Sequence, residues 1–314
     1  MNIGLDMMGG DFAPLEAVLG IQLFMSDTVA DVNIFCIGDE ALVQPLIKEY
    51  NVSSPNLHFI HAPEVIGYHE HPTKALKEKQ QSSIAIGFHL LATGKIDALI
   101  SAGNTGAMLV GAMFTIKAIE GISRPTIATI MPKIKGSTGV LLDVGLNADC
   151  KPELLNQFAL LGSLYAEHIL GIQDPSVGLI NVGEEEGKGN ILAQATYPLL
   201  KENNKIRFVG NIEGRDFFSD KADVMVCDGF TGNVVLKMAE SIYDMAQQRG
   251  IETDSFFSRF HYENYGGTPV LGVAKPVIIG HGISSAKAFK NMIHVATKMI
   301  ATNICSKMAD SFKA

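Results

Sequence analysis

Residues 177–190 read VGLINVGEEEGKGN, an apolar run that stops at a charged, glycine-rich turn. The run Val177–Val182 is continuous rather than alternating, as in strands that are buried on both faces of a parallel sheet. A helical pattern follows the turn. The stretch therefore predicts one strand–turn–helix unit of an α/β fold.

The same pattern recurs along the 314 residues of the chain. Further buried strands are predicted at Ile3–Asp6, Val32–Ile37, Leu57–Ile60, Asp97–Ala102, Ile206–Val209 and Asp223–Cys227. Two segments, Thr126–Asp143 and Pro269–His281, instead read as pairs of strands around a short turn, which predicts antiparallel hairpins. We therefore expect an α/β/α sandwich with a mostly parallel sheet and hairpin additions. It would be one catalytic unit, 1–314, in which two lobes share one cleft.

Segments with a helical pattern of apolar residues separate most of the predicted strands. Pro152 opens one helix at a first-turn position. Ser284 or Ser285 can cap the last helix, whose apolar stripe runs from Phe289 to Ile304. The apolar faces of the helix that begins at Pro152 and of the last helix predict core packing and not a functional site.

The composition disfavours several classes of protein. Charged residues make up 18% of the chain and the formal net charge is -8, whereas a nucleic-acid-binding surface needs a basic face. The sequence has neither an apolar stretch long enough to span a bilayer nor a secretory signal, so we expect a cytoplasmic protein. Four dispersed cysteines without a CxxC pair argue against a zinc ribbon or a disulfide framework and for core packing. The cluster His69-Glu70-His71 lacks i,i+4 spacing, so it predicts a surface loop and not a metal site.

Glycine-rich polar turns follow five of the predicted strands. They read DMMGGD (6–11), GNTG (103–106), DVGLN (143–147), GEEEGKGN (183–190) and DGFTGN (228–233). In doubly wound sheets, ligands bind beyond the carboxyl ends of strands, where free N–H groups favour anions. Turns of this kind at one sheet edge predict an anion or phosphoryl site. The sequence lacks GxGxxG, GxxxxGK[ST] and GxSxG motifs, which disfavours a Rossmann dehydrogenase, a P-loop NTPase and an α/β-hydrolase.

Lys188 is the most informative single residue of these turns. It follows three glutamates and stands between two glycines, so a flexible loop can bring its charge close to a ligand. The alternative is a solvated charged loop without a function.

At these turns the sequence resembles the PlsX family of phosphate acyltransferases. The matching segments are LDMMGGDFAP (5–14), SAGNTGA (101–107), LDVGLNADCKP (142–152), VGLINVGEEEGKGN (177–190), FVGNIEGRD (208–216), VCDGFTGNVVLK (226–237) and GGTPVLGV…HGISS (266–285). They span nearly the whole chain in the order of the family. The resemblance implies a fold similar to phosphotransacetylases and isocitrate/isopropylmalate dehydrogenases.

The resemblance also implies a reaction, the phosphorolysis of a thioester. Inorganic phosphate would attack the acyl carbonyl of a long-chain acyl-acyl carrier protein and form acyl phosphate for phosphatidic acid synthesis. The predicted catalytic residues are Lys188, Asn104 and Asn233, which would supply charge and hydrogen-bond donors to phosphate or to the oxyanion. The predicted substrate-binding residues are Asp6, Gly9, Gly10, Asp11, Thr105, Gly106, Asn147, Gly189, Asn211, Arg215, Asp228, Thr231 and His281. Among these, Asp6 and Asp228 would orient donors and His281 would protonate the thiolate, with no cofactor and no metal.

Acyl carrier protein is the expected protein partner. Because it is acidic, it should dock on a basic patch, either Lys74, Lys77 and Lys79 or Lys133 and Lys135. The family commonly has Arg at position 77, where lysine keeps the charge and loses the bidentate fork.

A second surface is predicted at residues 249–263, as an exposed helical tip after a helix over Val234–Gln248. It places Phe256, Phe257 and Phe260 beside Arg259, which suits a reversible contact with a membrane surface. Relatives in the family are peripheral membrane enzymes, so the resemblance implies a location on the inner face of the membrane. The alternative is that these rings pack in the interface of the expected homodimer or against the body of the protein.

Three other functions remain open from the residues alone. A phosphate acetyl- or butyryltransferase would perform the same chemistry on acyl-CoA. An isopropylmalate-type oxidoreductase shares the fold but would need a metal and clustered arginines, whereas the five arginines here are dispersed. A non-catalytic scaffold that binds the carrier protein would release no thiol.

Overall fold

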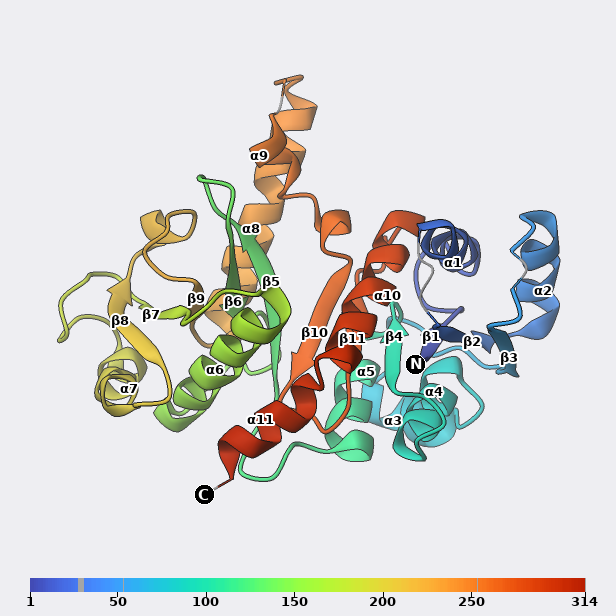
Figure 1. Ribbon diagram of the computed structural model, residues 1–314, viewed down its shortest axis with the longest axis horizontal. Helices are drawn as coiled ribbons and strands as arrows, with labels where there is room; N and C mark the ends of the chain where they lie inside the picture. Colours follow the sequence, from blue (N-terminus) through green and yellow to red (C-terminus); the bar gives the residue numbers. More distant parts are fainter. Residues whose placement is uncertain (28–30, 53, 253, 314) are drawn as a thin grey trace. The chain divides into compact units, whose positions relative to one another are not determined.

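The computed structural model describes residues 1–27, 31–52, 54–252 and 254–313, which form two compact units (Figure 1). Unit 1 comprises Met1–Ile119 and Glu263–Cys305, and unit 2 comprises Glu120–Tyr262 and Ser306–Ala314. Each unit contains its own parallel strands and covering helices. Two short elements complete the chain, η4 (Tyr262–Asn264) and α11 (Ile304–Phe312).

The strands of unit 1 follow the order β3-β2-β1-β4-β11-β10. Their bounds are β1 (Asn2–Asp6), β2 (Asn33–Gly38), β3 (Leu57–His61), β4 (Ala98–Ser101), β10 (Gly267–Leu271) and β11 (Val277–Gly280). Neighbouring strands are parallel from β3 to β11, and β10 pairs antiparallel with β11. Because parallel strands end at the same edge of a sheet, the carboxyl ends of β1, β4 and β11 lie side by side.

Helices cover both faces of the unit 1 strands (Figure 1). They are α1 (Leu15–Asp27), α2 (Glu40–Glu49), α3 (Pro72–Glu78), α4 (Ser83–Ala92), α5 (Thr105–Gly111), the π-helical turn η1 (Ala112–Ile116) and α10 (Ala286–Ala301). Helices α1 and α10 pack against each other on one face, so closely that a Cβ at Gly20 would lie 2.4 Å from Phe289 Cβ. On the other face α4 packs on the sheet, with Gly87 against Leu99. Full burial of a ring such as Phe289 contributes roughly 1.5–3 kcal/mol.

The strands of unit 2 follow the order β5-β6-β9-β7-β8. Its elements are β5 (Thr126–Pro132), β6 (Thr138–Leu142), α6 (Pro152–Tyr165), η2 (Ala166–Leu170), β7 (Ser176–Ile180), α7 (Ile191–Glu202), β8 (Arg207–Ile212), η3 (Gly214–Asp216), β9 (Val224–Val226), α8 (Gly229–Gln248) and α9 (Ser255–Ser258). Strands β5 and β6 are antiparallel, and β6, β9, β7 and β8 are parallel neighbours. Helices α6 and α7 pack together over these strands, and α8 contacts β6.

The predicted fold class is confirmed. Every predicted strand is present within a few residues of its expected bounds, and both predicted hairpins form as β5–β6 and β10–β11. Pro152 begins α6, and the Ser285 hydroxyl accepts a hydrogen bond from the Ala288 N–H at the start of α10. Among the helices that the structure describes, none is both long and apolar enough to cross a membrane.

One helix boundary was predicted wrongly. The apolar stripe from Phe289 to Ile304 read as one helix, but α10 ends at Ala301 and α11 begins at Ile304. Asn303 between them has φ +52°, a left-handed conformation that asparagine tolerates better than most residues. The apolar period continues across the break because both helices bury their apolar faces, so hydrophobicity alone does not reveal it.

Gly232 lies so close to the backbone of Asp143 that a larger residue at this position should destabilise unit 2. A Cβ at this position would lie 1.9 Å from the carbonyl oxygen of Asp143. Gly232→Ala should therefore lower the free energy of unfolding by about 2–3 kcal/mol, measured by urea denaturation. Gly187→Ala is the matched control, because no atom lies within 4 Å of its Cβ position. Equal unfolding midpoints for the two variants would contradict the expectation.

Candidate functional site

The five polar turns lie at the carboxyl ends of parallel strands, as predicted. In unit 1, β1 and β4 lead into residues 6–11 and 103–106, and β11 leads into His281. In unit 2, the turns 143–147, 228–233 and 183–190 follow β6, β9 and β7, which are adjacent in that order. Each unit therefore gathers its predicted site residues at one edge of its strands.

Asp6 ties two of the unit 1 turns together. Its carboxylate is 1% exposed and accepts hydrogen bonds from the Met8 N–H at 2.9 Å and from the Ser101 hydroxyl at 2.6 Å. The Ser101 hydroxyl oxygen in turn accepts from the Gly103 N–H at 3.0 Å. Burial raises the pKa of the Asp6 carboxyl, against the opposing effect of these hydrogen bonds. Asp6 thus orients backbone donors, as predicted, and its own oxygens are used inside the protein.

Asn104 is the N-cap of α5 and is 4% exposed. Its Oδ1 accepts a hydrogen bond from the Ala107 N–H at 2.9 Å, and its Nδ2 donates to the carbonyl oxygens of Gly67 at 2.8 Å and Glu70 at 3.3 Å. The amide is therefore occupied by the protein itself. Its side chain fixes the turn that presents the exposed Thr105, and the predicted contact of this turn with phosphate or the oxyanion stays a prediction.

The first and last turns of unit 1 meet at Asp11. The Asp11 N–H donates to the Gly282 carbonyl oxygen at 2.7 Å, which places the turn after β1 beside His281. Gly282 also packs against the Tyr68 hydroxyl, which donates to the Ala102 carbonyl oxygen at 3.0 Å. Burial and the charge of Asp11 raise the pKa of Tyr68. The Asp11 side chain is exposed and His281 is half-buried.

In unit 2, Asp143 organises the turn after β6. This fully buried carboxylate accepts hydrogen bonds from the N–H groups of Gly145, Leu146 and Asn147, and from Asn147 Nδ2 at 2.8 Å. Burial raises its pKa, and these four hydrogen bonds act in the opposite direction. Asn147 is 5% exposed, and its Nδ2 also donates to the Pro125 carbonyl oxygen. Asn147 therefore shapes the turn, and its predicted role in substrate binding stays a prediction.

The start of α8 lies against this turn. Asp228 caps the helix: one carboxylate oxygen accepts from the Thr231 N–H at 2.9 Å and the other from the Thr231 hydroxyl at 2.8 Å. The Gly229 N–H donates to the Asn147 carbonyl oxygen at 2.7 Å. Asn233 is exposed, and its Nδ2 donates to the Val144 carbonyl oxygen at 3.1 Å. Unit 2 thus brings Asn233 and the exposed Gly145 together beside the first turn of a long helix.

Two asparagine side chains hold the backbone of the loop that carries Lys188. Asn181 Nδ2 donates to the Lys188 carbonyl oxygen at 3.0 Å, and Asn211 Nδ2 donates to the Glu185 carbonyl oxygen at 2.9 Å. A Cβ at Gly189, whose φ is +96°, would lie 2.2 Å from Asn181 Oδ1. Asn211 is 2% exposed. Gly189 and Asn211 therefore shape the loop, and their predicted role in substrate binding stays a prediction.

The positive charge of Lys188 is left for solvent or a ligand. Two of the three preceding glutamates pair elsewhere: Glu184 with Lys221 at 2.7 Å and Glu186 with Lys201 at 3.0 Å. Within the described ranges, no carboxylate lies at ion-pair distance from the exposed Lys188 ammonium. An unpaired ammonium on a restrained loop is suited to an anionic ligand.

The structure also places the His69-Glu70-His71 cluster and Arg215. His69, Glu70 and His71 lie in a loop as predicted, and Glu70 pairs with Lys79 at 2.6 Å. The described residues contain no group of three or more His, Cys, Asp or Glu side chains that could hold a metal ion. Arg215 is exposed and pairs with Glu213 at 2.8 Å.

Cys227 packs in the core as predicted. Its side chain is 3% exposed, and burial raises the pKa of its thiol further from the range of a reactive thiolate.

Sequence reasoning missed Ser101, Tyr68 and Asp143 as members of the site. Ser101 and Asp143 stand inside the quoted motifs, next to residues that were selected. The buried Ser101 and Asp143 each order the turn beside them, and the signal for this was a polar residue directly at the end of an apolar strand. Tyr68 is 47% exposed in a loop, and no sequence signal singled it out.

The exposed aromatic tip was predicted only in part. Phe257 is 38% exposed and Phe256 is half-buried, but Phe260 is 7% exposed and contacts Phe218 edge-to-face at 5.2 Å. Arg259 donates to the carbonyl oxygens of Lys133 and Ser137, which fixes this segment on the β5–β6 hairpin of the same unit. The expectation that Phe260 is exposed is therefore wrong.

The lysines of the two candidate basic patches differ in burial and in ion pairing. Lys133 is fully buried and donates to the Ala222 carbonyl oxygen, so it cannot meet a partner. Lys135 pairs with Asp220 at 3.0 Å, and Lys79 pairs with Glu70. Lys74 and Lys77 are exposed, and the described residues place no carboxylate at ion-pair distance from either.

Comparison with known proteins shows which family the chain belongs to. A family model described as fatty acid synthesis protein matches residues 1–249 and 250–307. A phosphate acyltransferase of Dictyoglomus turgidum is 41% identical over 99% of this chain and 97% of its own length. A phosphate acyltransferase of Aquifex aeolicus is 43% identical over 100% of this chain and 97% of its own length. The fold is similar to that of a phosphotransacetylase from Streptococcus pyogenes, with a TM-score of 0.69 at 16% identity, covering 96% of this chain and 94% of the other.

Proposed function

Because the chain belongs to the PlsX family of phosphate acyltransferases, we propose that its donor is a long-chain acyl-acyl carrier protein and that its product feeds phospholipid synthesis. The observation that supports this proposal most directly is the exposed Lys188 ammonium on its restrained loop, which has no ion-pair partner among the described residues. Transfer to phosphate needs a positive charge near an anionic nucleophile, and this loop supplies one.

The proposed reaction exchanges a thioester for an acyl phosphate. A phosphate oxygen attacks the acyl carbonyl carbon and forms the new C–O bond. The C–S bond then breaks, its electron pair leaves with the carrier sulfur, and the thiolate takes up a proton. The phosphate dianion is itself the nucleophile, because the second pKa of a phosphate group is near neutrality, at about 6 for a phosphorylated side chain. No nucleophilic side chain is required, so the protein acts by positioning and by electrostatic stabilisation.

The proposed roles fall into two groups. Lys188 supplies charge to phosphate or the oxyanion. Asn233 and Thr105, which are both exposed, supply hydrogen-bond donors. Asn104 and Asp143 are positioning residues, because their polar atoms are bonded within the protein. His281 is the proposed proton donor to the thiolate.

A thiol-release assay tests this function. Purified protein is mixed with palmitoyl-acyl carrier protein, with and without phosphate, and free thiol and acyl phosphate are measured. We expect release that depends on phosphate and yields one acyl phosphate per thiol. Equal kcat/KM for palmitoyl-CoA would favour the acyl-CoA alternative. Thiol release without phosphate, or none at all, would contradict the proposal.

A reversible membrane contact is the proposed role of α9, and it is compatible with a cytoplasmic protein. Phe256 and Phe257 present apolar surface there, whereas Phe260 does not. In liposome flotation, Phe256→Ser with Phe257→Ser should lower the bound fraction at least threefold, because less apolar area enters the interface. Leu42→Ser, at a side chain that is 51% exposed on α2, is the control. Unchanged flotation of the double variant would contradict the contact. The homodimer stays a prediction that light scattering tests.

A further inference from the structure

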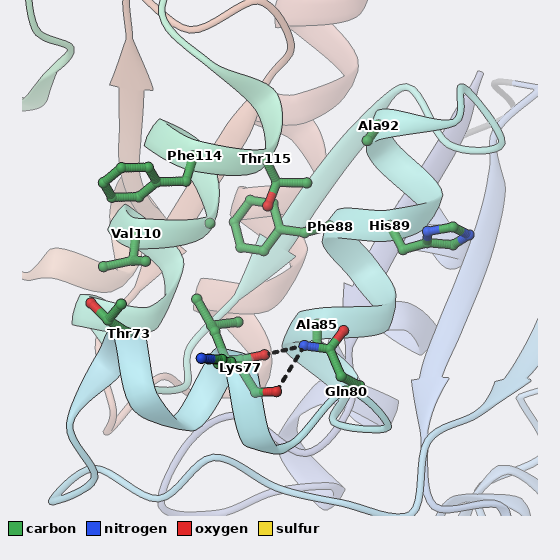
Figure 2. Close-up of a pocket in the computed structure, with 12 residues that line it drawn as sticks. Thr73, Lys77, Gln80, Ala85, Phe88, His89, Ala92, Val110, Phe114 and Thr115 are labelled. Carbon is green, nitrogen blue, oxygen red and sulfur yellow. Dashed lines mark hydrogen bonds between the residues drawn. The ribbon is translucent and has the colours of Figure 1, made fainter.

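A groove of about 370 Å³ opens in unit 1 between α3, α4 and the continuous helix α5–η1 (Figure 2). Its floor is apolar and includes Phe88, which is 2% exposed, and Leu76 and Val110. Phe114 stands at its side and is 70% exposed, an unusual position for a large ring next to other apolar surface. The groove can therefore accept an apolar side chain of a binding partner.

Two exposed lysines lie at the groove on α3, and the exposed carboxylate of Glu78 follows them on the same helix outside the lining. The lining of the groove includes Lys77 and His89 and no carboxylate, although the chain as a whole has a net charge of -8. Lys74 lies three residues before Lys77 on α3, so the two share one side of the helix. Both are exposed, and in the described part of the chain neither is engaged by an acidic side chain. This is a local positive surface on an acidic protein.

The groove is linked to the turn that holds Asn104. The first residue of α3, Pro72, packs on Gly106 so closely that a Cβ there would lie 2.4 Å from Pro72 Cγ. Asn104 Nδ2 donates to the Glu70 carbonyl oxygen just before α3. From Thr105 to Phe114 the helix rises about 14 Å at roughly 1.5 Å per residue. A partner seated in the groove would need a flexible arm of about this length to reach the turn.

We propose that this groove docks the protein part of the thioester donor. The partner is an acidic carrier domain that places an apolar side chain between Phe88 and Phe114 and carboxylates opposite Lys74 and Lys77. This inference rests on the proposed function. The acyl chain itself is a poorer occupant, because an open groove with a largely exposed Phe114 would leave much of the chain in water. A second copy related by a two-fold axis is disfavoured, because it would place the same lysines opposite each other.

Direct binding is the first test, with fluorescently labelled apo-acyl carrier protein titrated with the full-length protein. Lys74→Glu with Lys77→Glu, and separately Phe114→Ser, should each raise Kd at least tenfold. The charge variant should also lose most of the salt dependence of wild-type binding. Lys298→Glu, an exposed charge reversal on α10 on the opposite face of the unit, is the control and should bind like wild type. Wild-type Kd in both groove variants would overturn the proposal.

Turnover with two donors identifies the occupant of the groove. The same variants are assayed with palmitoyl-acyl carrier protein and with palmitoyl-pantetheine, which has no protein part. A rise in KM confined to the carrier donor supports docking. An equal rise with both donors would place the acyl chain in the groove and overturn docking. A wild-type protein that binds the carrier but shows no phosphate-dependent release would remove the proposed activity, and the binding series would still decide the docking face.

Discussion

Replacement of Lys188 by alanine is expected to lower the turnover of acyl-acyl carrier protein by about 100- to 1000-fold, the usual loss when one group that stabilises an oxyanion is removed. The protein should stay folded, because the Lys188 side chain is exposed and the loop is held through its backbone by Asn181 and Asn211. The measurement is kcat and kcat/KM by thiol release, beside a urea unfolding curve. The loss should fall on kcat, since the charge acts most strongly on the developing anion.

Glu185→Gln is the matched control for this prediction. It changes one charge on the same loop at an exposed side chain and leaves intact the Glu185 carbonyl oxygen that Asn211 holds. We expect turnover within threefold of wild type. Near-wild-type turnover of Lys188→Ala would remove Lys188 from the mechanism. A large loss in both variants would indicate that loop conformation, and not the Lys188 charge, is what matters.

Replacement of Asp143 by alanine should have the largest effect on stability. It removes the acceptor of five hydrogen bonds, from four backbone N–H groups and from Asn147 Nδ2, at a fully buried position; the longest, from the Ile127 N–H, measures 3.5 Å. A buried donor without a partner costs roughly 1–3 kcal/mol, and the exposed Gly145 can regain water, so we expect a loss of about 4 kcal/mol. That is a large part of the total stability of a typical domain, about 5–15 kcal/mol. Urea denaturation measures the loss.

Asp228→Asn provides the contrast. Asp228 caps α8, and asparagine is about as good an N-cap as aspartate, so this variant should lose less than about 1 kcal/mol. A comparable loss at both positions would show that the buried network around Asp143 has no special weight.

The pH dependence of stability should also report on Asp143. Burial raises the pKa of this carboxyl in the folded protein, so the unfolded chain gives up the proton first as the pH rises. The stability that the group contributes is complete below the ordinary aspartate pKa of about 3.9 and is lost as the pH rises through the folded pKa. Asp143→Asn does not titrate there. The stability difference between wild type and this variant should therefore shift in favour of the variant across that pH interval.

Much of the fold could be predicted from the sequence, because its local signals agree with one another. Continuous apolar runs such as Val177–Val182 mark strands buried on both faces, and Pro152 and Ser285 mark helix starts by their backbone chemistry. The break at Asn303 could not be predicted in the same way. Apolar periodicity reports which side chains are buried, and it continues through a short turn between two helices that bury their apolar faces.

The candidate site was predicted at the level of turns and not of side-chain roles. Asparagine in a glycine-rich turn can face a ligand or bond its own backbone, and the sequence does not distinguish the two. In the structure the side chains of all three asparagines bond the protein, but Asn104 and Asn147 are buried whereas Asn233 is exposed. The outcome depends on which carbonyl oxygens and N–H groups arrive from distant segments, such as Gly67 for Asn104.

The sequence by itself determined the α/β class, the polar turns at the carboxyl ends of its strands and, through long matching motifs, the phosphate acyltransferase family. These follow from local periodicity, backbone preference and residue order, which any segment carries alone. Only the tertiary structure decided that Lys133 and Phe260 are buried, that Lys79 is paired, and that Lys74, Lys77 and Lys188 are exposed with no carboxylate of the described residues at ion-pair distance. The physical reason is that burial and pairing belong to groups that meet across the fold, and no single segment contains both members of such a contact.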